Sequence, residues 1–143
     1  MKKHVGIDVS KRFFDLHIFE DNQNKHWDYT TQEVQKCVAW LAGQEVALVV
    51  MEATGGYETE LADQLQAAGL PVAIINPRRM REFAKATGVL AKTDKMDART
   101  IARYGATLQP PVEDKMDTNA RFLRILTARR QQLIEMRTAE NNL

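Results

Sequence analysis

The sequence predicts an α/β fold in which a mixed five-stranded sheet carries helices on both faces. Residues 5–29 alternate apolar and polar side chains in three short runs, which is typical of an antiparallel meander. Two continuously apolar runs, 46–51 and 72–75, are typical of strands buried on both faces. Segments with apolar residues at helical spacing follow these runs, as the crossovers between parallel strands require.

The meander is predicted from three runs and one turn. Residues 5–9 and 14–18 each place an apolar side chain at every second position, the period of a half-buried strand. Residues 21–24 are Asp-Asn-Gln-Asn, which favours a turn. Trp27 and Tyr29 then mark a third, shorter strand, so we expect His26 in the hairpin.

The helices are bounded by residues that favour helix ends. Thr30 and Glu33 form a capping box for a helix that ends near Gly43. Asn76 is the expected N-cap of a later helix, with Pro77 at its first position. The resulting order of three strands followed by alternating helices and strands is ribonuclease H-like. The helix residues expected to face inward are Val34, Cys37, Val38, Leu41, Leu61, Leu65 and Ala68. Gly69 and Gly88 are expected to end helices.

The composition of the chain excludes a membrane-spanning protein and a fold held together by internal disulfide bonds. No apolar run approaches the roughly 20 residues of a transmembrane helix. Residues 1–6 lead directly into a strand pattern and contain no apolar signal-peptide region. Cys37 is the single cysteine of the chain, so an internal disulfide is excluded. A lone thiol fits a reducing compartment, and we expect a cytoplasmic location.

The net charge of +1 conceals a strong asymmetry along the chain. Residues 1–75 carry 6 Lys/Arg and 11 Asp/Glu, whereas residues 76–105 carry 8 Lys/Arg and 3 Asp/Glu. A basic block of this kind predicts a polyanionic partner. The alternative, supported equally by charge alone, is a pair of solvated helices.

Two carboxylates lie inside the basic block. Thr93 is the expected N-cap of a helix that runs to about Tyr104, which places Asp94 and Asp97 in its first turn. Residues three apart on a helix share a face. Two carboxylates on one face repel each other unless a cation or a proton lies between them. The basic residues beside them are Lys92, Lys95 and Arg99.

Two further acids are expected at the carboxyl ends of strands. Asp8 lies in the first strand on the side opposite its apolar residues, and Glu52 follows the buried run 46–51. If these strands are parallel neighbours, Asp8 and Glu52 approach each other where α/β sheets form their sites. With Asp94 and Asp97 they would form a four-carboxylate site for Mg²⁺, or alternatively Mn²⁺, acting on a phosphodiester. Each acid taken alone is better explained as structural.

Basic residues near the acids are the expected contacts for nucleic acid, because lysine and arginine neutralise phosphates. The three histidines, in contrast, show no metal-ligand spacing. Tyr57 either contacts nucleic acid or covers the edge of the core. The expected nucleic-acid-binding residues are Lys11, Arg78, Arg79, Arg81, Lys92, Lys95 and Arg99.

A boundary at Gln109-Pro110-Pro111 divides the chain into residues 1–108 and residues 109–143. The second part is a linker and a long helix that begins near Asp117. Its apolar residues either pair with a second copy as a coiled coil or pack back on the domain. These residues, which follow a 4-3 spacing, are Phe122, Leu126, Leu133, Met136 and Leu143.

Four stretches together resemble the N-terminal domain of DEDD transposases, the family of the insertion-sequence-110 group and the pilin-gene-inverting recombinases. The resemblance covers about residues 4–105, and the tail resembles the family's linking coiled coil. The stretches are Gly6-Ile7-Asp8-Val9-Ser10-Lys11, Met51-Glu52-Ala53-Thr54-Gly55-Gly56-Tyr57, Ile75-Asn76-Pro77 with Phe83-Ala84, and Ala91-Lys92-Thr93-Asp94 through Asp97-Ala98 to Ile101-Ala102.

The resemblance implies a fold similar to the RuvC Holliday-junction resolvase. It implies that Asp8, Glu52, Asp94 and Asp97 hold magnesium as the family's four acids. Members move or invert DNA by site-specific recombination, assemble as oligomers, and in the insertion-sequence group use a structured non-coding RNA as a guide. A C-terminal domain supplies a serine nucleophile to a composite site. That domain is not in these 143 residues, so we expect a fragment that does not recombine DNA alone.

Three other functions are weighed against this one. A non-catalytic nucleic-acid-binding and dimerisation module would use the acids structurally and depend on the tail helix. A stand-alone RuvC-like junction nuclease would cleave branched DNA without further domains. A sugar-kinase or actin-like nucleotide-binding half is disfavoured, because such proteins need two similar domains and several Gly-rich loops, whereas this chain has seven glycines.

Overall fold

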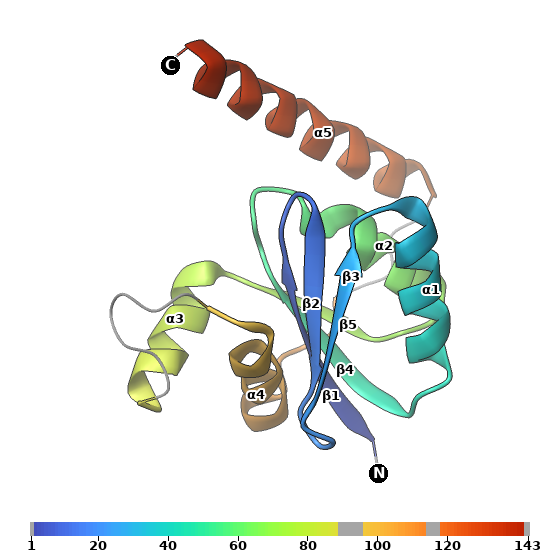
Figure 1. The fold of residues 1–143 in the computed structure, drawn as a ribbon, viewed down its shortest axis with the longest axis vertical. Helices are drawn as coiled ribbons and strands as arrows, with labels where there is room; N and C mark the ends of the chain where they lie inside the picture. Colours follow the sequence, from blue (N-terminus) through green and yellow to red (C-terminus); the bar gives the residue numbers. More distant parts are fainter. Residues whose placement is uncertain (1, 89–95, 114–117, 142–143) are drawn as a thin grey trace.

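The structure is a computed structural model that describes residues 2–88, 96–113 and 118–141. Strands and helices follow one another as the sequence predicts (Figure 1). The strands are β1 (Lys3–Val9), β2 (Phe13–Ile18), β3 (Gln23–Asp28), β4 (Val46–Glu52) and β5 (Val72–Ile75). The helices are α1 (Thr31–Ala42), α2 (Glu58–Ala67), α3 (Pro77–Ala86), α4 (Ala98–Leu108) and α5 (Thr118–Asn141).

The five strands form one mixed sheet in the order β3-β2-β1-β4-β5. β2 pairs antiparallel with both β1 and β3, whereas β4 pairs parallel with both β1 and β5. This order and these directions are the ribonuclease H-like arrangement, which confirms the predicted fold class. The parallel pairing of β1 and β4 brings the carboxyl ends of these two strands together.

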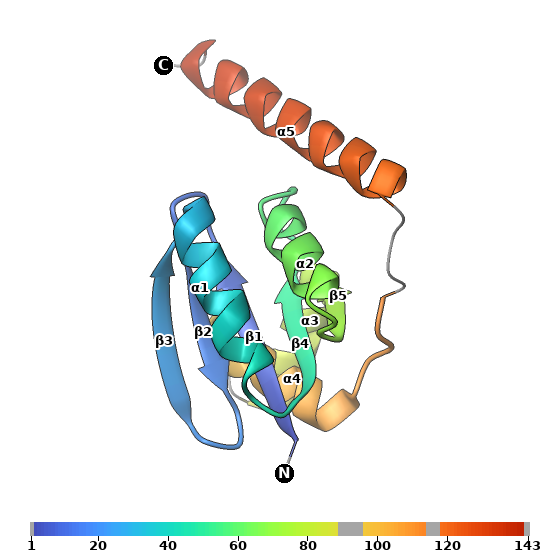
Figure 2. The same ribbon diagram turned by 90° about the vertical axis from the view of Figure 1, so that its right-hand side faces the viewer.

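Helices α1 and α2 cover one face of the sheet, and α3 and α4 lie on the other (Figures 1 and 2). The core is correspondingly split into two clusters of buried side chains. One cluster joins Val5, Ile7 and Val9 of β1 to α1 and α2. The other joins β4 and β5 to Met80 of α3 and Ile101 of α4. Because side chains alternate along a strand, the even-numbered positions of β1 face α4.

Gly6 allows α4 to approach β1 more closely than a side chain would permit. A Cβ atom at Gly6 would overlap the backbone of Ala98 and Ala102 and lie 2.8 Å from Ala102 Cα. The first turn of α4 therefore lies directly against β1. This contact sets the start of α4 beside the carboxyl end of that strand.

The predicted N-caps Thr30 and Asn76 are confirmed, and each accepts a hydrogen bond from an amide two or three residues later in the chain. Thr30 Oγ1 accepts a hydrogen bond from Glu33 N at 3.2 Å, and Asn76 Oδ1 accepts from Arg78 N at 2.8 Å. Gly69 follows α2 with φ +82°, a conformation that glycine adopts without strain. These contacts satisfy amide groups that a helix leaves unpaired at its ends.

Two local predictions are wrong. β3 begins at Gln23, inside the predicted turn 21–24, because Asn22 alone adopts the left-handed conformation (φ 50°) and an exposed edge strand tolerates polar residues. His26 is therefore a strand residue rather than a hairpin residue. Ala68, expected to point inward, is exposed at the end of α2.

Helix α5 lies across the end of the sheet at which β1 and β4 terminate (Figure 1). It contacts the loop after β4, where a Cβ at Gly56 would lie 3.0 Å from Ala128 Cβ. Part of α5 thus packs back on the domain, one of the two expected arrangements. Among its described side chains, the exposed large apolar ones are Leu123, Leu126, Leu133, Ile134 and Met136. None of the helices in the described ranges has both the length and the hydropathy needed to cross a bilayer.

Candidate active site

Asp8 and Glu52 lie next to each other at the carboxyl end of the sheet. β1 and β4 are parallel with Ile7 opposite Met51, and each acid is the next residue of its strand. Both carboxylates are half-buried and face the side of the sheet that α3 and α4 cover. We expected these two acids to approach each other if their strands were parallel neighbours. The strands are parallel neighbours, and the two acids lie side by side.

Glu52 is in an environment that disfavours its charge. Burial and, secondarily, the nearby Asp8 carboxylate raise the pKa of Glu52 above its ordinary value, while Arg81 on α3 lowers it. The Asp8 carboxylate thus repels the charged form of Glu52, whereas the Arg81 guanidinium attracts it. Arg81 is half-buried, and its charge acts on Glu52 in this structure.

Replacing Glu52 with glutamine is expected to stabilise the fold at neutral pH. A carboxyl whose pKa is raised by folding binds its proton more tightly in the folded state, so stability falls as pH rises through that pKa. Glu52→Gln removes this loss, and we expect a gain of about 0.5 kcal/mol at pH 7, kept small because solvent screens a half-buried group. The gain should shrink below the ordinary pKa of glutamate.

Urea denaturation at pH 7 and at pH 4 measures this difference. Glu82→Gln, a matched change on the exposed surface of α3, should leave the free energy of unfolding nearly unchanged. A Glu52→Gln variant that is less stable than the parent chain at pH 7 would contradict the expectation.

Asp97 is the N-cap of α4 rather than a residue of its first turn. Its backbone is extended (φ −123°, ψ 169°), and its Oδ1 accepts from Thr100 N at 2.9 Å. The predicted helix start at Thr93 is therefore wrong, because aspartate competes with threonine for the capping position. Asp94, Lys92 and Lys95, like Thr93, lie outside the described residues.

Asp8 and Asp97 line one shared hollow beside β2 and β3. The close contact between Gly6 and α4 explains this, since it fixes the first residues of α4 next to the end of β1. Arg99 also lines the hollow, and its expected contact with nucleic acid stays a prediction. The lining residues are Asp8, Asp15, Leu16, Asn24, Lys25, His26, Asp97, Ala98 and Arg99.

The donor set at this edge fits a hard divalent cation. Asp8 and Glu52 provide carboxylate oxygens, and their mutual repulsion is what a cation between them would relieve. Within residues 2–88, 96–113 and 118–141, no three His, Cys, Asp or Glu side chains are grouped closely enough to hold a metal ion. The described part of the proposed site is thus the Asp8 and Glu52 pair, with Asp97 lining the same hollow as Asp8.

The remaining basic residues are distributed over two elements. Arg78 and Arg79 are exposed on the first turn of α3. Lys11 lies in the β1–β2 turn, and its Nζ donates to Met136 Sδ at 3.6 Å. Lys11 therefore contacts α5 in this structure, and not the hollow that Arg99 lines.

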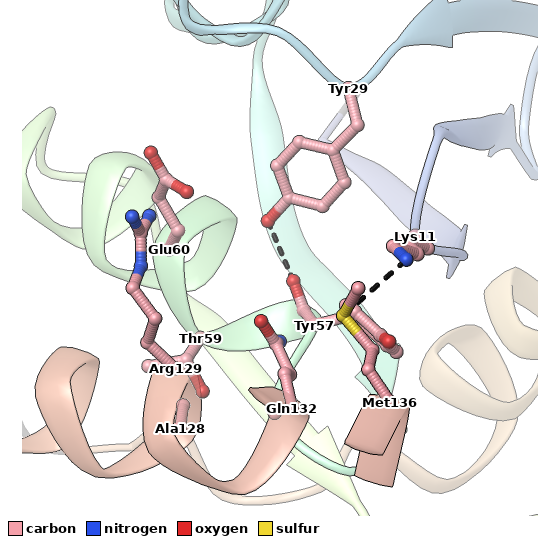
Figure 3. Close-up of a pocket in the computed structure, with 10 residues that line it drawn as sticks. Lys11, Tyr29, Tyr57, Thr59, Glu60, Ala128, Arg129, Gln132 and Met136 are labelled. Carbon is pink, nitrogen blue, oxygen red and sulfur yellow. Dashed lines mark hydrogen bonds between the residues drawn. The ribbon is translucent and has the colours of Figure 1, made fainter. Parts of the chain in front are cut away.

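A second hollow lies between α5 and the loop that follows Glu52 (Figure 3). Tyr29 Oη donates to the backbone oxygen of Tyr57 at 2.6 Å and accepts from Leu61 N at 3.2 Å. Tyr29 therefore anchors the loop that leads out of β4, a role that sequence reasoning missed. The lining residues are Lys11, Tyr29, Gly56, Tyr57, Thr59, Glu60, Ala128, Arg129, Gln132 and Met136.

Asp15 and His26 also escaped the sequence interpretation. The register pairs Asp8 with Asp15 and Asp15 with His26, so the three residues form a row across β1, β2 and β3. His26 Nδ1 and Asp15 Oδ1 are hydrogen-bonded at 2.6 Å. The sequence contains no regular spacing that links Asp8, Asp15 and His26. Their alignment follows only from which residues pair across the strands.

Comparison with known proteins identifies relatives along nearly the whole chain. The profile of the DEDD transposases of the insertion-sequence-110 group, described as "Transposase", matches residues 5–143. Pilin gene-inverting proteins of Moraxella bovis and Moraxella lacunata are each 32% identical over 152 residues, an alignment that covers 99% of this chain and 47% of each relative. The chain thus spans about half the length of the curated relatives it matches.

One solved structure is similar at lower identity. It is T. thermophilus RuvC in complex with Holliday junction substrate, with a TM-score of 0.46 and 15% sequence identity. The superposition covers 76% of this chain and 97% of that chain.

Proposed function

Because this chain belongs to the DEDD transposase family of the insertion-sequence-110 group, we propose that it is the metal-binding catalytic domain of a DNA transposase or site-specific recombinase. The observation that carries the proposal is the parallel pairing of β1 and β4, which places Asp8 beside Glu52. Asp94 and Asp97 would complete the four-carboxylate set of a DEDD enzyme. The reaction proposed is metal-dependent cleavage and exchange of DNA strands.

The roles of individual residues follow from their positions. Asp8 and Glu52 would hold Mg²⁺ or Mn²⁺ through their carboxylate oxygens, each from the end of a rigid strand. The bound cations would stabilise negative charge on the attacking and leaving oxygens of a phosphodiester. Asp97 would contribute from across the hollow while its cap bond to Thr100 N keeps it oriented. Arg99 would neutralise a DNA phosphate at the same hollow.

Further proposals concern the complete protein and rest on the resemblance to the family. A C-terminal domain would supply the serine nucleophile of a composite active site. A structured non-coding RNA would guide the choice of DNA, and α5 would join copies of the chain into an oligomer as a coiled coil. Cys37, a buried free thiol, supports the expected cytoplasmic location.

Metal binding by the chain itself tests the proposal. Titration with Mg²⁺ or Mn²⁺ in a calorimeter should give a binding isotherm for the parent chain, and Asp8→Asn should weaken the affinity by about tenfold or more, since removing a ligand's charge removes a principal attraction. Asp28→Asn, at the exposed end of β3, is the matched control and should bind as the parent does. An Asp8→Asn isotherm that equals that of the parent would rule out the four-acid site.

One observation favours the alternative of a non-catalytic dimerisation module. Helix α5 exposes several apolar side chains, among them Leu123, Leu126 and Leu133, which are suited to a second helix. Association in sedimentation experiments together with no metal binding would support that alternative. Association together with metal binding would support the transposase domain with an oligomerising helix.

A further inference from the structure

Among the described residues, no helix covers β3 or the Phe13–Asp15 end of β2 on one face of the sheet, beside the proposed active site. Helix α4 packs mainly against β1 and reaches β2 only near its other end, where His17 is buried (Figure 1). On that same face the register aligns Asp8, Asp15 and His26 across three strands. Directly paired residues point to the same side of a sheet, so this row extends from the carboxylate site onto the uncovered strands.

His26 is held in a fixed orientation on this surface. Its Nδ1 hydrogen-bonds Asp15 Oδ1 at 2.6 Å, and both side chains are about half exposed. A carboxylate that accepts from Nδ1 fixes the ring and directs Nε2 toward a ligand. Nε2 is therefore placed to donate to, or accept from, a group that lies over β3.

Phe13 provides an aromatic surface next to His26. It precedes Asp15 by two positions in β2, so both side chains lie on the same face. The Phe13 ring lies 5.0 Å from the His26 ring at an angle of 42°, and 41% of the residue is exposed. An exposed phenylalanine beside an oriented imidazole is the type of surface on which an unstacked nucleobase packs.

The surface is continuous with the proposed active site. One hollow is lined both by Asp8 and Asp97 of the proposed site and by Asp15 and His26, with Arg99 contributed by α4. His26 is two strands away from Asp8, a separation of ~10 Å at the usual strand spacing. A short stretch of single-stranded DNA is therefore long enough to connect the carboxylates to His26.

We propose that single-stranded DNA crosses β3 and the Phe13–Asp15 end of β2 on its way to the carboxylate site. One base stacks on Phe13. The phosphate near it accepts a hydrogen bond from Nε2 of the imidazolium form of His26, since Nδ1–H already donates to Asp15. Asp15 acts as a positioning residue that orients His26. This inference rests on the proposed function, since it assigns the path of the DNA substrate of that same site.

The stacking contact is tested by fluorescence anisotropy with a short labelled single-stranded DNA in EDTA, so that metal binding plays no part. Phe13→Ala should weaken binding at least about fivefold, the usual effect of removing one base-stacking ring. Phe13→Tyr should bind as the parent does, whereas Phe13→Leu, which keeps an apolar side chain without a ring, should lose the affinity. Leu108→Ala, another exposed apolar residue, is the control and should change nothing.

The phosphate contact is tested in the same assay with His26→Ala. Binding should weaken roughly threefold to tenfold, as expected for the loss of one hydrogen bond. Thermal unfolding of Phe13→Ala and His26→Ala should match the parent, because both positions are exposed. If the melting temperature is unchanged and DNA binding is weaker, the substituted side chain contacts the DNA rather than stabilising the fold.

The outcomes separate this inference from the proposed function. Equal DNA binding by the parent, Phe13→Ala and His26→Ala would overturn the inference, and so would a parent chain that binds no single strand. Tighter binding to RNA of the same sequence would overturn the assignment to DNA. If Phe13→Ala weakens DNA binding while Asp8→Asn leaves the metal isotherm unchanged, the surface binds DNA and the proposed function fails.

Discussion

Replacing Gly6 with alanine is expected to destabilise the fold by roughly 3 kcal/mol or more, at the upper end of the cost of overpacking. The added Cβ would overlap backbone atoms of Ala98 and Ala102, and backbone in the first turn of a helix cannot move aside without shifting the helix. We also expect the variant to bind metal poorly, because α4 would carry Asp97 away from Asp8. Urea denaturation and calorimetry measure the two effects.

Gly43→Ala is the matched control for this change. Gly43 has φ −83°, which any residue adopts, and an added Cβ would meet Trp40 O at an ordinary 3.5 Å. We expect the control to be neutral or stabilising by up to about 1 kcal/mol, because alanine reduces the freedom of the unfolded chain. If Gly6→Ala unfolds at the same urea concentration as the parent, the close contact between β1 and α4 is not required.

Replacing Phe14 with alanine is expected to cost about 3–5 kcal/mol, the usual effect of deleting a buried aromatic ring. Phe14 is fully buried, and its ring lies 6.4 Å from that of Trp27 and 5.5 Å from that of Tyr29. It thus connects β2 to β3 and to the loop that Tyr29 anchors. Chemical denaturation followed by tryptophan fluorescence measures the loss.

The neighbouring Phe13 provides a control of the same residue type. It lies one position earlier on the opposite face of β2 and is 41% exposed, so Phe13→Ala should change the free energy of unfolding by less than about 1 kcal/mol. Phe14→Ala should therefore impair folding, and Phe13→Ala should impair only the binding of single-stranded DNA. Equal destabilisation by both substitutions would show that the faces of β2 are assigned wrongly.

Strands and helix caps were predictable because their causes are local. The alternation in residues 5–9 and 14–18 decides which side chains a strand can bury, and the interaction of Thr30 with Glu33 joins residues three apart. The start of β3 was less predictable. Polar residues such as Gln23 suit a turn and an exposed edge strand equally, so composition did not distinguish between the two.

The acids illustrate a second limit. Asp8 and Glu52 were identified in the sequence as candidates, but their proximity depends on β1 and β4 being parallel neighbours. The position of Asp97 depended on which of two capping residues starts α4, and the structure places that start at Ala98. Threonine and aspartate are both favoured N-cap residues, so capping preference alone did not decide between Thr93 and Asp97. A helix that starts at Ala98 is the one that packs against Gly6.

Patterns along the chain were enough to establish the order of the elements, the sides on which strands are buried, and the acids and bases available for chemistry. Which of these residues come together depended on the tertiary fold. The pairing register placed Asp15 and His26 in line with Asp8, and the docking of α4 placed Asp97 across the same hollow. The physical reason is that periodicity acts between neighbours along the chain, whereas register and helix docking depend on contacts between residues far apart in it.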